Sequence, residues 1–357
     1  MYFINKIIGE QMNKLKLIVA LTAGLFAFTS VNAGEMSVTG SMHVSYQSEQ
    51  NNVTGNPLGM NTDLTFSGST DTDFGTVSMS LATDGTFVGD SGADHTYSLA
   101  TGLGTFSVAN NGDAANAVDD ITPTAFEEAN GSGSGSYTTD FGSGMDGSMS
   151  LAYSNGDVLG TGISVKYSYY PRLDGTTNNE KGASGGALPS ADSAESINVG
   201  IPLSGVPVLG DSPLGGAKIT IGYENSDSRV TNAQPKEGGT VAVVMPLGAL
   251  KVGYQKKAYQ AKGTSVAEAQ DGFFKDDIIG VAYAVNDELA VSYNVIQSDR
   301  HLHSNANGEV EQETKAINLA YTVGGLTLGF QDAKTSNSGY SKSTDNDTRT
   351  ISIKTAF

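Results

Sequence analysis

The sequence contains no cysteine and no tryptophan, and it has only 20 basic residues against 38 acidic ones. Without cysteine the chain has no disulfide framework, no thiol nucleophile and no cysteine-ligated zinc. The formal net charge of −18 argues against nucleic-acid binding, because such binding depends on Lys and Arg neutralising phosphates. Hydrophobic residues make up only 38% of the chain, whereas 45 of its 357 residues are glycine. This composition argues against an ordinary enzyme core built of helices.

The first 33 residues have the layout of a secretory signal peptide. Lys14 and Lys16 form a basic segment, and residues 17–28 form a short apolar segment that leads to a small residue, Ala33. We therefore expect export through a signal peptide cleaved after Ala33. A transmembrane anchor is the alternative, and it is disfavoured because the apolar segment is short.

The domain organisation follows from this leader. Residues 1–11 precede a second methionine, Met12, and we interpret them as an upstream extension of the signal peptide. Residues 34–357 are predicted to form one exported domain. No apolar run in this domain reaches about 18 residues, which excludes a membrane protein built from several spanning helices.

From residue 34 onward, apolar residues alternate with small polar ones in short runs separated by Gly, Asn, Asp and Ser. Clear examples are residues 163–169, 250–254, 279–283, 289–295 and 317–321. This two-residue period is typical of strands with one apolar face. Seventeen candidate runs occur, of which residues 134–140 form the weakest. Because a closed antiparallel barrel with both termini at one rim needs an even number, we expect sixteen strands, with about fourteen or eighteen as alternatives.

The connections between these runs alternate between tight turns and long polar loops. Residues 248–249 form a tight turn, whereas residues 299–313 form a long polar connection. This alternation is typical of an up-and-down barrel with two unlike rims. A soluble β-sandwich shares the two-residue period. The barrel is favoured because Ser, Thr, Gly and Asn occupy the polar positions, as a water-filled lumen requires, and because tyrosines recur near strand ends, as in membrane-interface girdles.

The end of the chain strengthens the prediction of a transmembrane barrel. Ile351, Ile353 and Phe357 fall on one face of the last alternating run. A terminal aromatic residue on such a strand is typical of outer-membrane barrels. The predicted fold class is therefore all-β, a transmembrane antiparallel up-and-down β-barrel.

Two further motifs carry a family resemblance. Residues 66–71 (FSGSTD) precede the first tight turn, and residues 102–108 (GLGTFSV) include the predicted fifth strand. Together with the signal peptide, the alternating strands and Phe357, they resemble the Gram-negative general porins, particularly the sixteen-stranded alphaproteobacterial kind, over residues 34–357. The resemblance implies a homotrimer in the outer membrane, in which each barrel surrounds a water-filled pore for small hydrophilic solutes and ions. It also implies a third long loop that folds inward and narrows the pore.

In this sequence the third loop is predicted at residues 110–136. The loop contains no basic residue, and its carboxylates are Asp113, Asp119, Asp120, Glu127 and Glu128. We expect these carboxylates to line the constriction and to attract cations. The alternative is that they only keep an exposed loop solvated.

The sequence departs from the porin pattern on the early strands. Porin fifth strands usually end in Gly-Arg, whereas Ala109 and Asn110 occupy these positions here, and no Lys or Arg occurs between Lys16 and Lys166. The arginine cluster that the family places opposite the acidic loop is therefore missing from its usual location. If the apolar positions of the later strands face lipid, the lysines at the alternate positions face the lumen. The alternative is that these lysines lie at the rim of the barrel. These cations are Lys166, Lys218, Lys251 and Lys354.

The acidity is concentrated in the first half of the predicted barrel. Residues 34–165 hold 16 carboxylates and no basic residue, whereas residues 166–357 hold 21 acidic and 17 basic residues. Because the third loop belongs to the acidic half, this division predicts a pore that prefers cations.

Other kinds of chemistry receive little support from the sequence. No serine lies in an elbow motif, so we expect no enzyme and no catalytic residue. We expect no cofactor and no dedicated metal site, with calcium bound by acidic loops as the one alternative, although no loop has regularly spaced calcium ligands. A secreted structural or adhesive surface protein without a pore, and a substrate-specific outer-membrane channel, remain the alternative functions.

Overall fold

The computed structural model describes most of the chain beyond the predicted signal peptide. The described residues are 35–49, 56–84, 94–110, 112–127, 129, 141, 145, 148–173, 193–206, 210, 212, 214–227, 235–260, 271–302 and 310–357. The predicted signal peptide, residues 1–33, lies outside them, as does the weak candidate strand at residues 134–140. The predicted division of the chain at residue 34 therefore stays a prediction.

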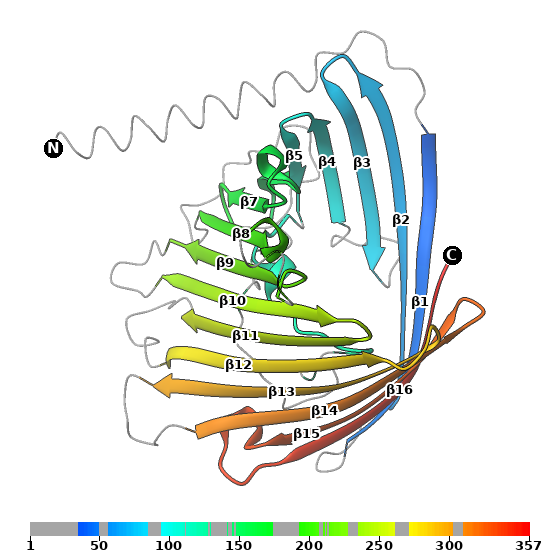
Figure 1. The fold of residues 1–357 in the computed structure, drawn as a ribbon, viewed down its shortest axis with the longest axis vertical. Helices are drawn as coiled ribbons and strands as arrows, with labels where there is room; N and C mark the ends of the chain where they lie inside the picture. The colour runs from blue at the N-terminus through cyan, green and yellow to red at the C-terminus, as the bar shows by residue number, and fades with distance from the viewer. Residues whose placement is uncertain are drawn as a thin grey trace, which may run out of the picture.

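The described residues form sixteen antiparallel strands that close into one barrel (Figure 1). Each strand pairs with its neighbours in the sequence, and β1 also pairs with β16. The predicted fold and strand number are thereby confirmed. The strands are β1 (Glu35–Glu49), β2 (Leu58–Thr72), β3 (Gly75–Asp84), β4 (Asp94–Thr101), β5 (Gly104–Ala109), β6 (Ser150–Asn155), β7 (Ser164–Tyr170), β8 (Ala194–Pro202), β9 (Lys218–Ser226), β10 (Lys236–Leu247), β11 (Leu250–Gln260), β12 (Asp271–Ala284), β13 (Leu289–Leu302), β14 (Val310–Val323), β15 (Leu326–Ser336) and β16 (Asn346–Ala356).

The first and last strands close the barrel side by side. Their register places Val44 opposite Ile353 and Tyr46 opposite Ile351. At the end of the chain, the backbone N–H of Gly40 donates to the carbonyl of Phe357 at 2.8 Å, and the N–H of Phe357 donates back at 2.9 Å. Because these pairs leave β1 and β16 without a free edge, the strands present no unpaired edge to lipid.

The two rims of the barrel differ in their connections. On one rim, here called the turn side, most strands are joined by short connections, such as the turns that lead into Gly75 and Gly104. Both glycines have positive φ angles, 137° and 124°, which other residues rarely adopt. A longer connection on this rim, residues 203–217, joins β8 to β9. The opposite rim, the loop side, carries the long connections, including the short helix η4 (Ser338–Tyr340). No helix in the described part of the chain is long and apolar enough to cross a membrane.

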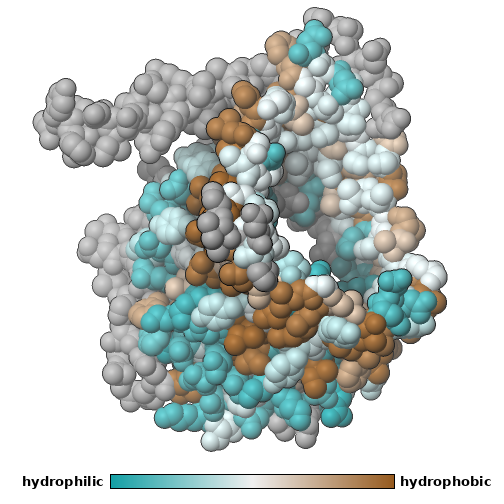
Figure 2. Space-filling model, viewed as in Figure 1, coloured by the Kyte–Doolittle hydropathy of each residue, from teal (hydrophilic) through white to brown (hydrophobic). Residues whose placement is uncertain are grey.

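Apolar and polar side chains alternate between the outer face and the lumen, as the two-residue period predicts. On β16, for example, Ile351 and Ile353 are exposed on the outer face, whereas Thr350 and Ser352 are buried on the inner face. In Figure 2, hydrophobic residues gather near the middle of the visible face, and hydrophilic residues cover the left, where the loop-side ends of β9 to β13 lie. The outer face therefore carries an apolar band that can be buried in lipid.

Tyrosines mark a border of this band. Tyr223 donates from its hydroxyl to Glu237 at 2.9 Å, and Tyr167 donates to Glu195 at 3.0 Å. On β11 and β12, Lys256 contacts Asp277 on the outer face at 2.9 Å. Aromatic rings that end in a hydrogen-bonded hydroxyl suit the membrane–water interface.

Candidate functional site

The connection between β5 and β6 is the predicted third loop, and it extends past its predicted end to residue 149. Its described part lies inside the barrel, where it contacts strands from β7 to β16. At its start, Oδ1 of Asp113 accepts hydrogen bonds from the hydroxyl of Ser196 at 2.6 Å and from the N–H of Ala115 at 2.8 Å. Asn198 donates to the carbonyl of Ala114 at 2.5 Å. These contacts hold the start of the loop against β8.

Asp113 thus lies away from the open lumen, with a residue exposure of only 2%. Lys166 on β7 donates to the backbone carbonyl of Asp113 at 3.0 Å. Both residues therefore act on the position of the loop, although the sequence predicted them as a constriction carboxylate and a lumen cation.

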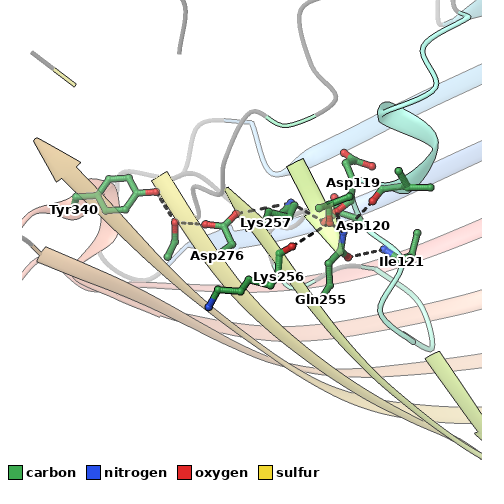
Figure 3. A network of polar contacts seen from close by, with 11 residues as sticks. Asp119, Asp120, Ile121, Gln255, Lys256, Lys257, Asp276 and Tyr340 are labelled. Atoms are coloured by element: carbon green, nitrogen blue, oxygen red, sulfur yellow. Dashed lines mark hydrogen bonds and ion pairs between the residues drawn. The ribbon is translucent and has the colours of Figure 1, made fainter. Parts of the chain in front are cut away.

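One glutamine holds the middle of the loop. Gln255 on β11 donates to the carbonyls of Val118 and Asp119 at 2.9 and 2.7 Å, and its Oε1 accepts from the N–H of Ile121 at 3.1 Å (Figure 3). A buried side-chain amide is stable only where its donors and acceptor find partners. Gln255 therefore fixes the loop beside the short helix η1 (Asn116–Val118).

A buried ion network lies next to this glutamine. The amine of Lys257 lies 3.4 Å from Asp120 on the loop and 3.9 Å from Asp276 on β12. Asp276 accepts a hydrogen bond from Ser298 at 2.5 Å, and Ser298 contacts the hydroxyl of Tyr340 in η4 at 2.7 Å (Figure 3). Lys257 was missing from the predicted cations, although extending the alternation of β11 by three residues places it in the lumen.

Asp119 differs from the neighbouring Asp120. Burial and the negative charge of Asp120 raise the pKa of the Asp119 carboxyl to about 6, although Lys257 partly opposes this shift. Within the described residues, no ion pair to Asp119 occurs. Its charge therefore changes close to neutral pH.

The far end of the loop reaches the last strands. Lys354 on β16 donates to Oε1 of Glu127 at 2.7 Å, and Gln331 on β15 donates to the backbone carbonyl of Glu127 at 3.2 Å. The amine of Lys354 also lies 4.7 Å from the ring centre of Phe126, a cation–π contact. The ring of His43 on β1 meets the Phe126 ring edge-on at 6.4 Å. The loop therefore follows the inner wall from β7 to β16.

Glycines on the lumen face make room for the loop. A Cβ atom added at Gly280 would lie 2.7 Å from the carbonyl oxygen of Pro123, and one added at Gly329 would overlap the ring of Phe126. Three further positions have the same relation to the loop, namely Gly222 beneath Val118, Gly253 beneath Pro123 and Gly238 beneath Phe141. The wall is therefore shaped for this path of the loop.

Apart from the contact between His43 and Phe126, the first five strands face the part of the lumen that the described loop residues leave open. Their inward side chains are mostly hydroxyls, such as the pair Ser37 and Ser67 at 2.8 Å and the pair Ser78 and Ser98 at 2.7 Å. Asp63 adds a carboxylate to this wall, and no Lys or Arg occurs in β1 to β5. An opening remains visible beside these strands in Figure 2. The open lumen therefore lies between a hydroxyl-lined wall and the acidic loop.

The predicted cations do not form one cluster. Lys166 and Lys354 contact the loop. Lys218 and Lys251 occupy lumen-facing positions of their strands nearer the turn side, and neither forms an ion pair within the described residues. Sequence reasoning also missed Lys236, which lies 3.2 Å from Glu224 in a buried pair.

Two predictions about this region stay open. Glu128 lies outside the described residues. Across the described ranges, no group of three or more His, Asp or Glu side chains is placed to hold a metal ion. Calcium binding by the acidic loops therefore stays a prediction.

The family model for Gram-negative porins matches residues 19–355 of the sequence. The chain belongs to the Gram-negative porin family. This membership places the protein in the outer membrane as a channel and agrees with the barrel described above. The predicted absence of catalysis stays a prediction, although the family and fold are those of non-enzymatic channels.

Solved porin structures share the fold of this porin at low sequence identity. A porin refined at 1.8 Å is 13% identical, has a TM-score of 0.59 and aligns over 90% of this chain and 100% of its own. OmpF of Salmonella typhi, solved with daunomycin, is 13% identical and has a TM-score of 0.62. The alignment covers 91% of this chain and 98% of OmpF. The outer membrane channel DcaP of Acinetobacter baumannii is 16% identical and has a TM-score of 0.58. The alignment covers 92% of this chain and 99% of DcaP. A search of curated protein sequences gave no significant match.

Proposed function

We propose that this porin is a water-filled channel for passive diffusion of small hydrophilic solutes and ions, and that it prefers cations. The observation that carries the proposal is the arrangement of charge around the open lumen. The hydroxyl-lined wall of β1 to β5 has no Lys or Arg, and the loop opposite it carries Asp119 without an ion-pair partner in the described part of the chain.

The basic residues near the loop do not offset this arrangement. Lys257 is almost fully buried between Asp120 and Asp276, and Lys354 faces Glu127. A paired cation attracts few anions, because the field of its partner cancels most of its own. Lys218 and Lys251 also face the lumen, but they lie nearer the turn side. The charge that a permeating ion meets beside the loop is therefore mostly negative, which favours cations.

Reversal-potential measurements across a planar bilayer with a KCl gradient test the preference. We expect the reversal potential to have the sign that shows K⁺ to be more permeant than Cl⁻. The magnitude of this reversal potential should be smaller in Asp119→Asn. Thr122→Val, a change in the same loop without charge, serves as the matched control. An anion preference in the unmodified protein would contradict the proposal.

The same recordings separate the remaining alternatives. A pore for general diffusion gives a conductance that rises in proportion to salt concentration. A substrate-specific channel shows saturable block by its ligand, and a structural surface protein gives no conductance although it is folded.

We further propose that the porin is a homotrimer that meets its neighbours through the outer face of β1 to β5 and meets lipid elsewhere. This face exposes large apolar side chains, including Met36, Val38, Met42 and Met60. On the opposite side of the barrel, the outer face carries charged residues such as Lys256 and Asp277 near the loop side. An apolar face without charges suits contact with another copy.

The oligomeric state is tested by the mass of the detergent-extracted protein. We expect a mass of three chains, which falls to one chain when Val38→Arg places a charge in the contact. Ile317→Arg, on the outer face of β14, is the matched control and should leave the trimer intact. A monomeric unmodified protein would overturn this part of the proposal.

A further inference from the structure

A cavity of about 350 Å³ lies inside the barrel between the third loop and the turn-side ends of β10 to β13. Ile121, Pro123, Thr124 and Ala125 form the part of its wall that belongs to the loop. Eight of its eleven lining residues are Ala, Ile, Val or Pro. The cavity therefore combines apolar side chains with polar surface.

The lumen face of these strands changes character along their length. Toward the loop side it carries Gln255 and Asp276 and the buried, loop-packed Ile278 and Ile296, whereas at the cavity it carries Val244, Ala282 and Ala290. The third loop covers only part of these apolar side chains, because the cavity remains between the loop and the strands. Apolar surface that is left facing water is a binding opportunity, since covering it is favourable by about 25 cal/mol per Å².

One cation borders this cavity. Lys251 on β11 lines it and is exposed. Its amine makes no ion pair with the residues that the structure describes, unlike those of Lys257 and Lys354, which face loop carboxylates. An accessible ammonium group beside apolar surface complements a molecule that combines an apolar body with one negative charge.

We propose that this cavity binds small aromatic carboxylates, with the carboxylate at Lys251 and the ring against the alanines of β12 and β13. The cavity volume lies near the lower end of the usual range for small-molecule sites, about 300–1,000 Å³, and suits a single ring. The site lies on the turn side of the acidic loop, so a bound anion occupies the lumen without passing the loop carboxylates.

Benzoate is the probe for this site, and saturation-transfer NMR on the detergent-solubilised full chain measures its binding. Lys251→Gln should weaken benzoate binding about tenfold, the expected effect of losing one charge-assisted hydrogen bond. Lys218→Gln is the matched control. Lys218 also carries a lumen-facing positive charge near the turn side, opposite Val244 in the sheet, but it does not line the cavity.

Two further comparisons separate the charge from the ring. Acetate has the charge without the ring, and benzamide has the ring without the charge, so both should bind at least about tenfold more weakly than benzoate. Ala282→Phe fills the cavity without changing any charge and should abolish benzoate binding. Heat-modifiable gel mobility of each variant verifies that its barrel is folded.

Several results would overturn the site. Benzoate that binds no better than acetate, equal losses in Lys251→Gln and Lys218→Gln, or full binding by folded Ala282→Phe would each contradict it. The measurement does not depend on ion flow. A protein that binds benzoate but conducts no ions would contradict the channel function alone, and a conducting protein that ignores benzoate would contradict the cavity alone.

Discussion

The amine of Lys257 lies 3.4 Å from the Asp120 carboxylate, so a buried lysine of the barrel wall neutralises a carboxylate of the third loop. The same amine lies 3.9 Å from Asp276, and its side chain is only 1% exposed. A buried charge that loses its partner is costly, because nothing replaces the solvation it has given up. Lys257 therefore sets both the position of the loop and the charge that the loop presents.

Lys257→Met should lower the stability of the barrel and raise its cation preference. Removing one partner of a buried ion pair costs about 3–5 kcal/mol, and the loop gains a net negative charge. Urea unfolding followed by gel mobility measures the first effect, and the reversal potential measures the second. The adjacent Lys256 points to the outer face, where its side chain is 48% exposed, so Lys256→Met should cost less than about 1 kcal/mol. Equal effects of the two changes would refute the role of Lys257.

Gly329→Val should displace the far end of the loop and increase single-channel conductance. The added side chain would occupy the space of the Phe126 ring, and overpacking of this kind costs about 1–3 kcal/mol. Gly239→Val is the control, because a Cβ there would approach only the carbonyl of Gly222, at 3.8 Å. Combining Gly329→Val with Phe126→Ala should recover the lost stability. No recovery would show that the glycine does not act through the ring.

The cation preference should depend on pH with a midpoint near 6. The Asp119 carboxyl, whose pKa is raised to about 6, carries its charge above that pH and loses it below. Its ionised fraction is about 90% at pH 7 and about 10% at pH 5, so the preference should fall on acidification. Reversal potentials recorded from pH 5 to 8 measure this change. Asp119→Asn should show a flat profile over that range, and a variant that keeps the full pH dependence would disprove the assignment.

Glu127→Gln and Lys354→Gln should shift selectivity in opposite directions. The first removes a negative charge from the loop and lowers the cation preference, and the second removes the facing positive charge and raises it. Their coupling in stability should stay below about 1 kcal/mol, because both side chains are partly exposed. The double variant should return close to the selectivity of the unmodified protein. Shifts of the same sign would mean that the pair does not face the permeating ion.

The strand pattern could be predicted because the membrane and the lumen impose opposite requirements on alternate residues. That alternation gives the outward position of Ile351 and the inward position of Lys354 directly. Lys257 and Asp276 were missed for a simple reason, since the predicted alternation on β11 and β12 stopped at Tyr254 and began at Ile279. Their inward positions follow once the same period is extended past those residues.

The path of the third loop could not be predicted in the same way. Its contacts join residues far apart in the sequence, such as Glu127 and Lys354, which are 227 positions apart. In the sequence, a glycine such as Gly329 is only a lumen-facing position without a side chain. The sequence does not indicate which side chain of the loop occupies the space beside it. For the same reason Asp113, predicted to line the pore, lies buried against Ser196.

The order of events during assembly follows from where the loop docks. The third loop precedes β7 to β16 in the chain, yet these strands supply the groups that hold it, ending with Lys354 three residues before the C-terminus. The set of docking points is complete only once β16 has formed, because Lys354 belongs to that strand. The far end of the loop can therefore be held only in a chain whose last strand is in place.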